Sequence, residues 1–204
     1  MTLITESEGS DVLRVRIEPW TAADLPLLRR TNAPEMTHHL GGPETEEQLL
    51  ARHARYLDLR EVGQMFRIVL DPEGMLVGSI GFWELNLRPE AAYETGWSVL
   101  PEFQGRGIAA AAAREVIAAA RAEGCHRSLH AFPSVDHAAS NAVCRKAGFD
   151  LVGECAFEYP KGRMMRSNEW RLDLVGEGDR RRNVVVRRRR GMGLRDEGLK
   201  GAGA

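Results

Sequence analysis

The most informative stretch of this chain is Gln104-Gly105-Arg106-Gly107-Ile108-Ala109. It follows a run from Tyr93 to Leu100 that predicts a strand, and it precedes an alanine-rich run, 108–123, that predicts a helix. A glycine-rich turn between a strand and a helix leaves backbone N–H groups unpaired at the positive end of the helix dipole. Glycines at 105 and 107 let a ligand approach that backbone closely. The stretch therefore predicts a binding site for a pyrophosphate group.

Other glycine-rich phosphate loops fit this turn less well. The P-loop needs Gly-x-x-x-x-Gly-Lys-Ser/Thr, and the sequence has no such string. The dinucleotide fingerprint needs a third glycine where Ala110 stands. A plain strand–helix turn without a ligand is the remaining alternative at this stage.

Size and composition predict one globular domain with appendages. The chain has 204 residues, of which 43% are hydrophobic. It has no long uncharged apolar run and no leader-like N-terminus, so we expect a cytoplasmic protein without a membrane partner. Three cysteines without a Cys-x-x-Cys spacing predict neither a disulfide framework nor a metal site.

Charge is unevenly distributed along the chain. Residues 176–204 hold nine Lys/Arg and four Asp/Glu, whereas residues 1–175 hold 19 Lys/Arg and 25 Asp/Glu. An acidic body favours a cationic or amine substrate through weak steering. The basic cluster 180–190 is the only stretch expected to contact nucleic acid or a ribosome, and a disordered extension is the plainer interpretation. We therefore expect a flexible segment 1–11, a domain 12–175 and a basic, disordered tail 176–204.

The pattern of the domain predicts a mixed α/β (α+β) fold. Strands are expected at 12–17, 64–70, 75–85, 93–100, 127–132, 150–159 and 164–174, and helices at 22–30, 46–59, 108–123 and 137–146. Residues 31–43 are expected to form a loop, and Asp136 is expected to cap the last helix. Such an order predicts about seven strands in one mixed, mostly antiparallel sheet with four flanking helices.

Three stretches resemble the GNAT superfamily of acyl-CoA-dependent N-acyltransferases. They are 94–109, with the glycine turn, Ile80-Gly81-Phe82, and Ala138-Ala139-Ser140 together with Lys146-Ala147-Gly148-Phe149. The pattern over about 12–175 is most similar to the ribosomal-protein N-terminal-alanine acetyltransferases. The resemblance implies acetyl-CoA as co-substrate, no metal, a fourth strand splayed from the fifth, and an amine acceptor. Many relatives form homodimers, and the oligomeric state of this chain is left open.

The resemblance also implies where the co-substrate binds. The turn would hold its pyrophosphate, and backbone groups of Ser98 and Val99 would pair with the pantetheine arm. His137 stands where many members have Asn, and Asn141, one helical turn on, is expected to compensate. The predicted co-substrate residues are Ser98, Val99, Gln104, Gly105, Arg106, Gly107, Ile108, Ala109, His137, Ser140 and Asn141.

Candidates for proton transfer are less specific. Glu94 is favoured as the general base, with Glu84 second and His38 and His39 third. Many members carry a Tyr acid where this chain has Cys144, so Ser140 is expected to contact the sulfur instead, with Cys144 an inert buried residue. We expect the aromatic residues Trp83, Trp97, Trp170 and Phe157 to belong to the core.

Three functions remain open from the sequence. The first is direct transfer of an acetyl group from acetyl-CoA to a primary amine, on a protein N-terminus or a small molecule. The second is a non-catalytic acyl-CoA sensor with an RNA- or ribosome-contacting tail. The third is a nucleic-acid-binding protein that acts through the basic tail 176–204.

Overall fold

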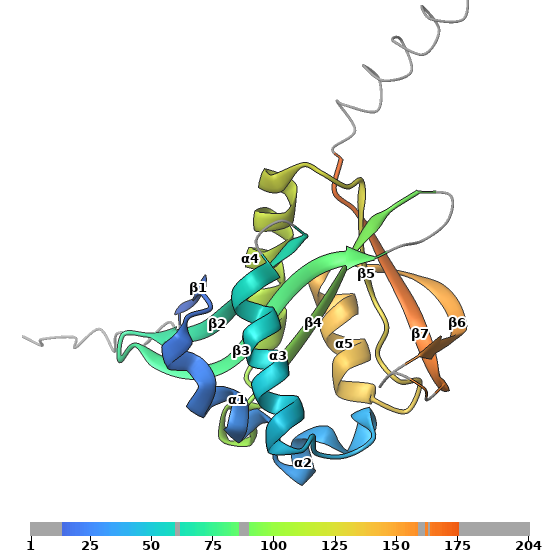
Figure 1. The fold of residues 1–204 in the computed structure, drawn as a ribbon. Coiled ribbons are helices and arrows are strands. Elements are labelled where there is room, and N and C mark those ends of the chain that lie inside the picture. The colour runs from blue at the N-terminus through green and yellow to red at the C-terminus, as the bar shows by residue number, and fades with distance from the viewer. Residues whose placement is uncertain (1–13, 60–61, 86–89, 159–161, 163, 176–204) are drawn as a thin grey trace, which may run out of the picture. The chain divides into compact units, whose positions relative to one another are not determined.

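The computed structural model describes residues 14–59, 62–85, 90–158, 162 and 164–175. All of these residues except Val175 belong to one compact unit, which ends at Leu174. The expectations for segment 1–11 and for the tail 176–204 lie outside the described residues. Figure 1 shows the unit as one twisted sheet with helices on both faces.

The sheet has seven strands in the order β1-β2-β3-β4-β5-β7-β6, which confirms the predicted mixed, mostly antiparallel sheet. Neighbouring strands are antiparallel except β4 and β5, which are parallel. The strands are β1 (Arg14–Pro19), β2 (Gly63–Asp71), β3 (Met75–Leu85), β4 (Ala92–Val99), β5 (Ser128–Ala131), β6 (Asp150–Glu158) and β7 (Met164–Asp173).

Five α-helices and shorter 3-10 turns surround the sheet. They are α1 (Leu25–Thr31), α2 (Pro34–Thr37), α3 (Glu46–Asp58), α4 (Ile108–Glu123) and α5 (Ala138–Ala147). Helix α3 begins where predicted, because the Thr45 hydroxyl accepts from the Gln48 amide and the Gln48 side chain accepts from the Thr45 amide. Helix α4 matches the predicted bounds, since alanine is the strongest helix former and Gly124 ends the helix at φ 68°.

Two details of the predicted helices were wrong. Residues 31–43 contain α2 and a 3-10 turn, His38–Leu40, instead of a loop. Pro34 opens α2 at a position that needs no N–H donor, and Gly41 ends the turn at φ 94°. At α5 the capping residue is His137, whose Nδ1 accepts from the Ser140 amide at 3.4 Å, in place of Asp136.

Apolar residues divide between the two faces of the sheet. The larger cluster joins α4 and α5 to the sheet and includes Ile68, Phe82 and Val116. The smaller cluster joins α1 and α3 to the other face and includes Leu28 and Leu49. The middle strands β2 and β3 are therefore largely buried, whereas the edge strand β6 is mostly exposed. Burial of apolar side chains on a face fixes the register of the strands against slippage.

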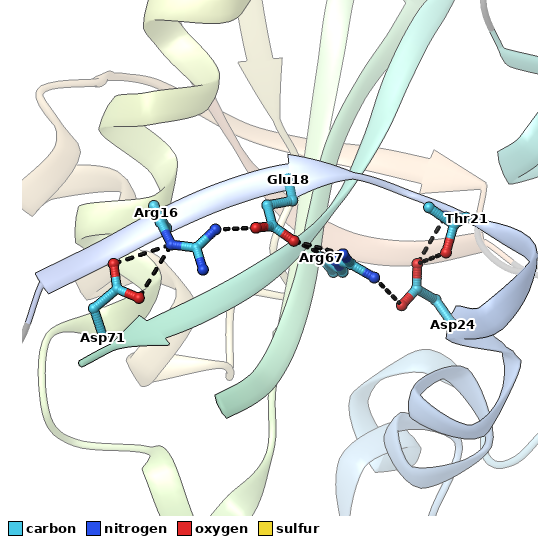
Figure 2. Close-up of polar contacts among 6 residues, drawn as sticks. All are labelled: Arg16, Glu18, Thr21, Asp24, Arg67 and Asp71. Atoms are coloured by element: carbon cyan, nitrogen blue, oxygen red, sulfur yellow. Dashed lines mark hydrogen bonds and ion pairs between the residues drawn. The ribbon is translucent and has the colours of Figure 1, made fainter. Parts of the chain in front are cut away.

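A chain of ion pairs fastens β1 to β2 and to the turn after β1 (Figure 2). Asp71 accepts from Arg16, which also pairs with Glu18. Arg67 bridges Glu18, at 2.6 Å, and the buried Asp24, at 3.2 Å. Asp24 also accepts from the amide and hydroxyl of Thr21, at 2.7 and 2.8 Å. These contacts set where α1 begins, and α1 forms one wall of the cleft described next.

Candidate active site

A cleft of about 480 Å³ opens where β4 and β5 diverge. Its walls come from α1, α2 and α3 on one side and from α5 and the ends of β5, β6 and β7 on the other. Most residues that the sequence singled out line it: Glu94, Ser98, Val99, Gln104, Gly105, Gly107, Ile108, Ala109, His137 and Ser140. Three others, Arg106, Asn141 and the second-choice base Glu84, do not.

The divergence of the strands is visible in their register. β4 pairs with β3 along its whole length, from Ala92 to Val99. It pairs with β5 only at Tyr93 and Glu94, opposite Leu129 and His130. The last five residues of β4 therefore have an edge that is not paired with β5, which is the expected splay of the fourth and fifth strands.

Backbone direction alternates along that edge. The Leu100 amide donates to the Val77 carbonyl at 2.9 Å, so the backbone of Leu100 faces β3. By alternation, the backbone of Ser98 also faces β3, while the backbones of Trp97 and Val99 face the gap. Of the two residues expected to offer backbone groups, Val99 therefore faces the gap and Ser98 faces β3. The amides of Trp97 and Val99 are the ones available to a ligand in the gap.

Gln104 holds the end of this edge in place. Its side-chain Nε2 donates to the Val99 carbonyl at 2.8 Å. Because that carbonyl has no partner on β5, the contact satisfies an acceptor that the splay would otherwise leave open. The Gln104 side chain therefore shapes the gap, a role that the sequence did not predict.

The glycine turn has the conformation that only glycine adopts easily. Gly105 has φ 74° and Gly107 has φ 80°. A Cβ atom at either position would meet no other atom within 4 Å, so the turn faces open space. Gly107 is the N-cap of α4, whose first amides have no partner within the helix. The turn is thus an open cradle that fits a pyrophosphate.

Glu94 lies beside the point where the gap opens. Its neighbours across the ladder are Trp83 on β3 and His130 on β5. Burial raises the pKa of the Glu94 carboxyl to about 7, and a hydrogen bond from the Trp83 side chain opposes that shift. A carboxylate with this pKa can take a proton from an amine and release it near neutral pH.

Helix α5 brings His137 and Ser140 to the opposite wall of the cleft. Burial, together with the neighbouring His39 and His38, lowers the pKa of His137 to about 4. His137 is therefore neutral near pH 7, in keeping with its Nδ1 accepting from the Ser140 amide. Ser140 follows on the same first turn of the helix and lines the cleft.

Three imidazoles stack across the cleft. The His38 and His39 rings lie 3.9 Å apart, and the His39 and His137 rings lie 4.2 Å apart. Burial and the nearby His38 lower the pKa of His39 too. The stack joins the 3-10 turn after α2 to the start of α5. The sequence named the three histidines but gave no sign that they meet.

Asn141 and Cys144 are directed away from the cleft. The Asn141 amide donates to the carbonyls of Ser134 and His137 and accepts from Asn168 and Trp170, so its polar groups are all used internally. It does not take over the contact expected of it. Cys144 is fully buried, and burial raises the pKa of its thiol to about 12.

Several aromatic residues expected in the core line the cleft instead. Trp83 and Phe157 do so, Trp97 lines the cleft and also packs against the core, and Trp170 is buried as expected. Sequence reasoning also missed Lys146, the only lysine among the described lining residues. Strand alternation assigns these aromatics to a face of the sheet, but it could not show that a cleft opens beside them.

None of the helices in the described ranges is long and apolar enough to cross a membrane. Within the same ranges, His, Cys, Asp and Glu form no cluster of three that could hold a metal ion.

Comparisons with known proteins agree with this architecture. A family model described as an acetyltransferase (GNAT) domain matches residues 14–150. No curated protein sequence matches the chain.

Three solved structures illustrate the structural likeness. An acetyltransferase from Salmonella typhimurium that modifies the N-terminal serine of a 50S ribosomal subunit protein has a TM-score of 0.65 and 21% identity, covering 78% of this chain and 94% of its own. Spermidine N-acetyltransferase from Vibrio cholerae, in complex with CoA and spermine, has a TM-score of 0.65 and 15% identity, and the match covers 78% of this chain and 95% of its own. Ribosomal-protein-S5-alanine acetyltransferase from Vibrio fischeri has a TM-score of 0.64 and 17% identity, and the match covers 80% of this chain and 97% of its own. At these identities the likeness establishes the fold.

Proposed function

This chain belongs to the acetyltransferase (GNAT) domain family, and we propose that it moves an acetyl group from acetyl-CoA directly to a primary amine. The observation that carries the proposal is the shared cleft. The glycine turn, the gap-facing edge of β4 and the half-buried Glu94 all open into it. A cradle for a pyrophosphate, a free strand edge and a base are the parts that this transfer needs.

The glycine turn and the β4 edge would position the co-substrate. The first amides of α4 donate to its phosphate oxygens, and the open space at Gly105 and Gly107 lets those oxygens come close. The gap-facing amide of Val99 donates to the thioester carbonyl and stabilises the negative charge that develops there. Exposed Arg106 lies outside the cleft, so the turn acts mainly through its backbone.

Glu94 and Ser140 would manage the protons. Glu94 accepts the ammonium proton, directly or through water, so that the neutral amine can attack the thioester carbon. The tetrahedral intermediate then collapses, the carbon–sulfur bond breaks, and the proton lost by the attacking nitrogen passes through the Ser140 hydroxyl to the departing thiolate. Transfer is direct, because Cys144 is buried with a strongly raised pKa and is no nucleophile.

Calorimetric titration of the purified chain with acetyl-CoA tests the binding step. We expect micromolar binding by the natural chain and none by Gly107→Trp, whose side chain fills the cradle. A folded natural chain that binds no acetyl-CoA would refute the proposal.

Two variants separate catalysis from sensing. Glu94→Gln and Ser140→Ala should keep acetyl-CoA binding while lowering turnover, by about 10²-fold or more for the base. Glu115→Gln is the matched control, because Glu115 is exposed on α4 outside the cleft. Unchanged turnover in both site variants would remove these residues from the mechanism. Binding without turnover of any amine would favour the sensor.

A further inference from the structure

The part of the cleft around Glu94 is walled by large apolar side chains. Trp83, Phe132, Phe157 and Met165 reach it from β3, the end of β5, β6 and β7. The Phe132 and Phe157 rings are stacked, with centroids 4.4 Å apart and planes 9° apart. Trp83, Glu94 and His130 are ladder partners, so their side chains share one face of the sheet, and by alternation Phe132 shares it too.

Strand register places these rings around the proposed base. Trp83 is the ladder partner of Glu94, and its indole lies over Gly96, where an added Cβ would approach it to 3.0 Å. Phe132 follows β5 two residues after His130, the other ladder partner of Glu94. A carbon skeleton attached to an amine at Glu94 therefore meets aromatic surface on two sides.

Charge in the cleft is suited to one ammonium group only. Among the described residues that line the cleft, the carboxylates are Glu35 and Glu94, and Glu35 is exposed on α2. Arg52 is already paired with Glu44 at 2.9 Å. A polyamine would bring two or more further ammonium groups, and beyond the exposed Glu35 the described lining offers them no carboxylate, so their loss of hydration is costly.

We propose that the acceptor is a monoamine whose primary amine is carried on an aromatic or similarly flat apolar group. Glu94 receives the amine, and the Phe132–Phe157 pair together with Trp83 holds the ring. This inference rests on the proposed function and narrows its acceptor class. Two kinds of molecule carry a primary amine and an aromatic ring in this way: a free arylalkylamine and a peptide with an N-terminal aromatic residue.

An acceptor panel at saturating acetyl-CoA tests this with the full chain. The probes are 2-phenylethylamine, n-butylamine, spermidine, and two short peptides that differ only in beginning with Phe or Ala. We expect kcat/KM for 2-phenylethylamine to exceed that for spermidine and n-butylamine by about tenfold or more, as apolar pockets discriminate by that order. The two peptides show which source of the aromatic amine is used.

Phe157→Leu should reduce the preference for 2-phenylethylamine over n-butylamine several-fold, because it removes one ring of the stacked pair. Met164→Ala, on the same hairpin but 62% exposed and outside the cleft, should leave the preference unchanged. Acetyl-CoA titration and a melting curve verify that each variant is folded.

The outcomes are distinguishable from failure of the proposed function. If acetyl-CoA binds and spermidine is used as well as the aromatic probes, the acceptor class is overturned and the transferase remains. The same holds if neither aromatic probe is acetylated, or if Phe157→Leu keeps the full preference. If the natural chain does not bind acetyl-CoA, both the proposed function and the proposed acceptor class are refuted.

Discussion

Adding one methyl group at either end of α4 separates the cost of a strained backbone from the loss of a binding site. Gly107 and Gly124 flank this helix with φ 80° and 68°. A Cβ at Gly107 meets nothing within 4 Å, and one at Gly124 meets only the Arg121 carbonyl at 3.9 Å. Gly107→Ala and Gly124→Ala therefore introduce the same backbone strain without a steric clash.

The expected magnitudes follow from that symmetry. An alanine in the left-handed region costs about 1–2 kcal/mol, partly offset because alanine has less freedom than glycine in the unfolded chain. A net loss of about 1 kcal/mol lowers the Tm by about 2–4 °C in a chain of this length. Only Gly107→Ala also displaces a phosphate from the amides of α4, and losing one charged hydrogen bond costs about 1.5–3 kcal/mol. Its Kd for acetyl-CoA should therefore rise about tenfold to a hundredfold.

Scanning calorimetry gives the Tm of each variant, and titration calorimetry gives the Kd of each variant for acetyl-CoA. Equal drops in Tm with weaker binding in Gly107→Ala alone would support the reasoning. If Gly124→Ala weakens binding as much, the effect is general destabilisation. If Gly107→Ala binds acetyl-CoA as tightly as the natural chain, the turn is not the phosphate cradle.

Three further predictions concern protons and ion pairs. Turnover should rise with pH to a plateau above about 7 as Glu94 loses its proton, and Glu94→Gln should flatten that limb in a pH–rate profile. The pKa of His137 falls from 6.5 unfolded to about 4 folded, so the stability it contributes is complete above pH 6.5 and declines toward pH 4; urea titrations should show a smaller decline for His137→Asn. Asp24→Asn should cost about 1–3 kcal/mol in urea unfolding, because it weakens buried contacts with Arg67 and Thr21; an unchanged midpoint would show that the ion-pair chain adds nothing.

Local patterns predicted much of the fold. The helix 108–123 and the strand 75–85 have the bounds expected from an alanine run and from alternation. The short helix α2 was missed because a single turn has too little periodicity to distinguish it from a loop. The family resemblance supplied the splay, which no local pattern encodes.

Side-chain direction in the cleft was harder to predict. Asn141 shares a helix with Ser140, yet it is held by Asn168 and Trp170, 27 and 29 residues further on. Trp83 and Phe157 were predicted to lie in the core, because strand alternation does not show where the helices leave part of a sheet face open as a cleft. Such outcomes depend on pairing between distant strands, which only the folded chain specifies.

The short pairing between β4 and β5 has a consequence for the stability of the protein in the cell. Only two residue pairs connect them, so a ligand lying in the gap would add contacts that span both halves of the sheet. Any ligand that binds only the folded chain stabilises it by mass action, by about 2.7 kcal/mol at a hundred times its Kd. The supply of acetyl-CoA would then set how long the protein survives as well as how fast it works.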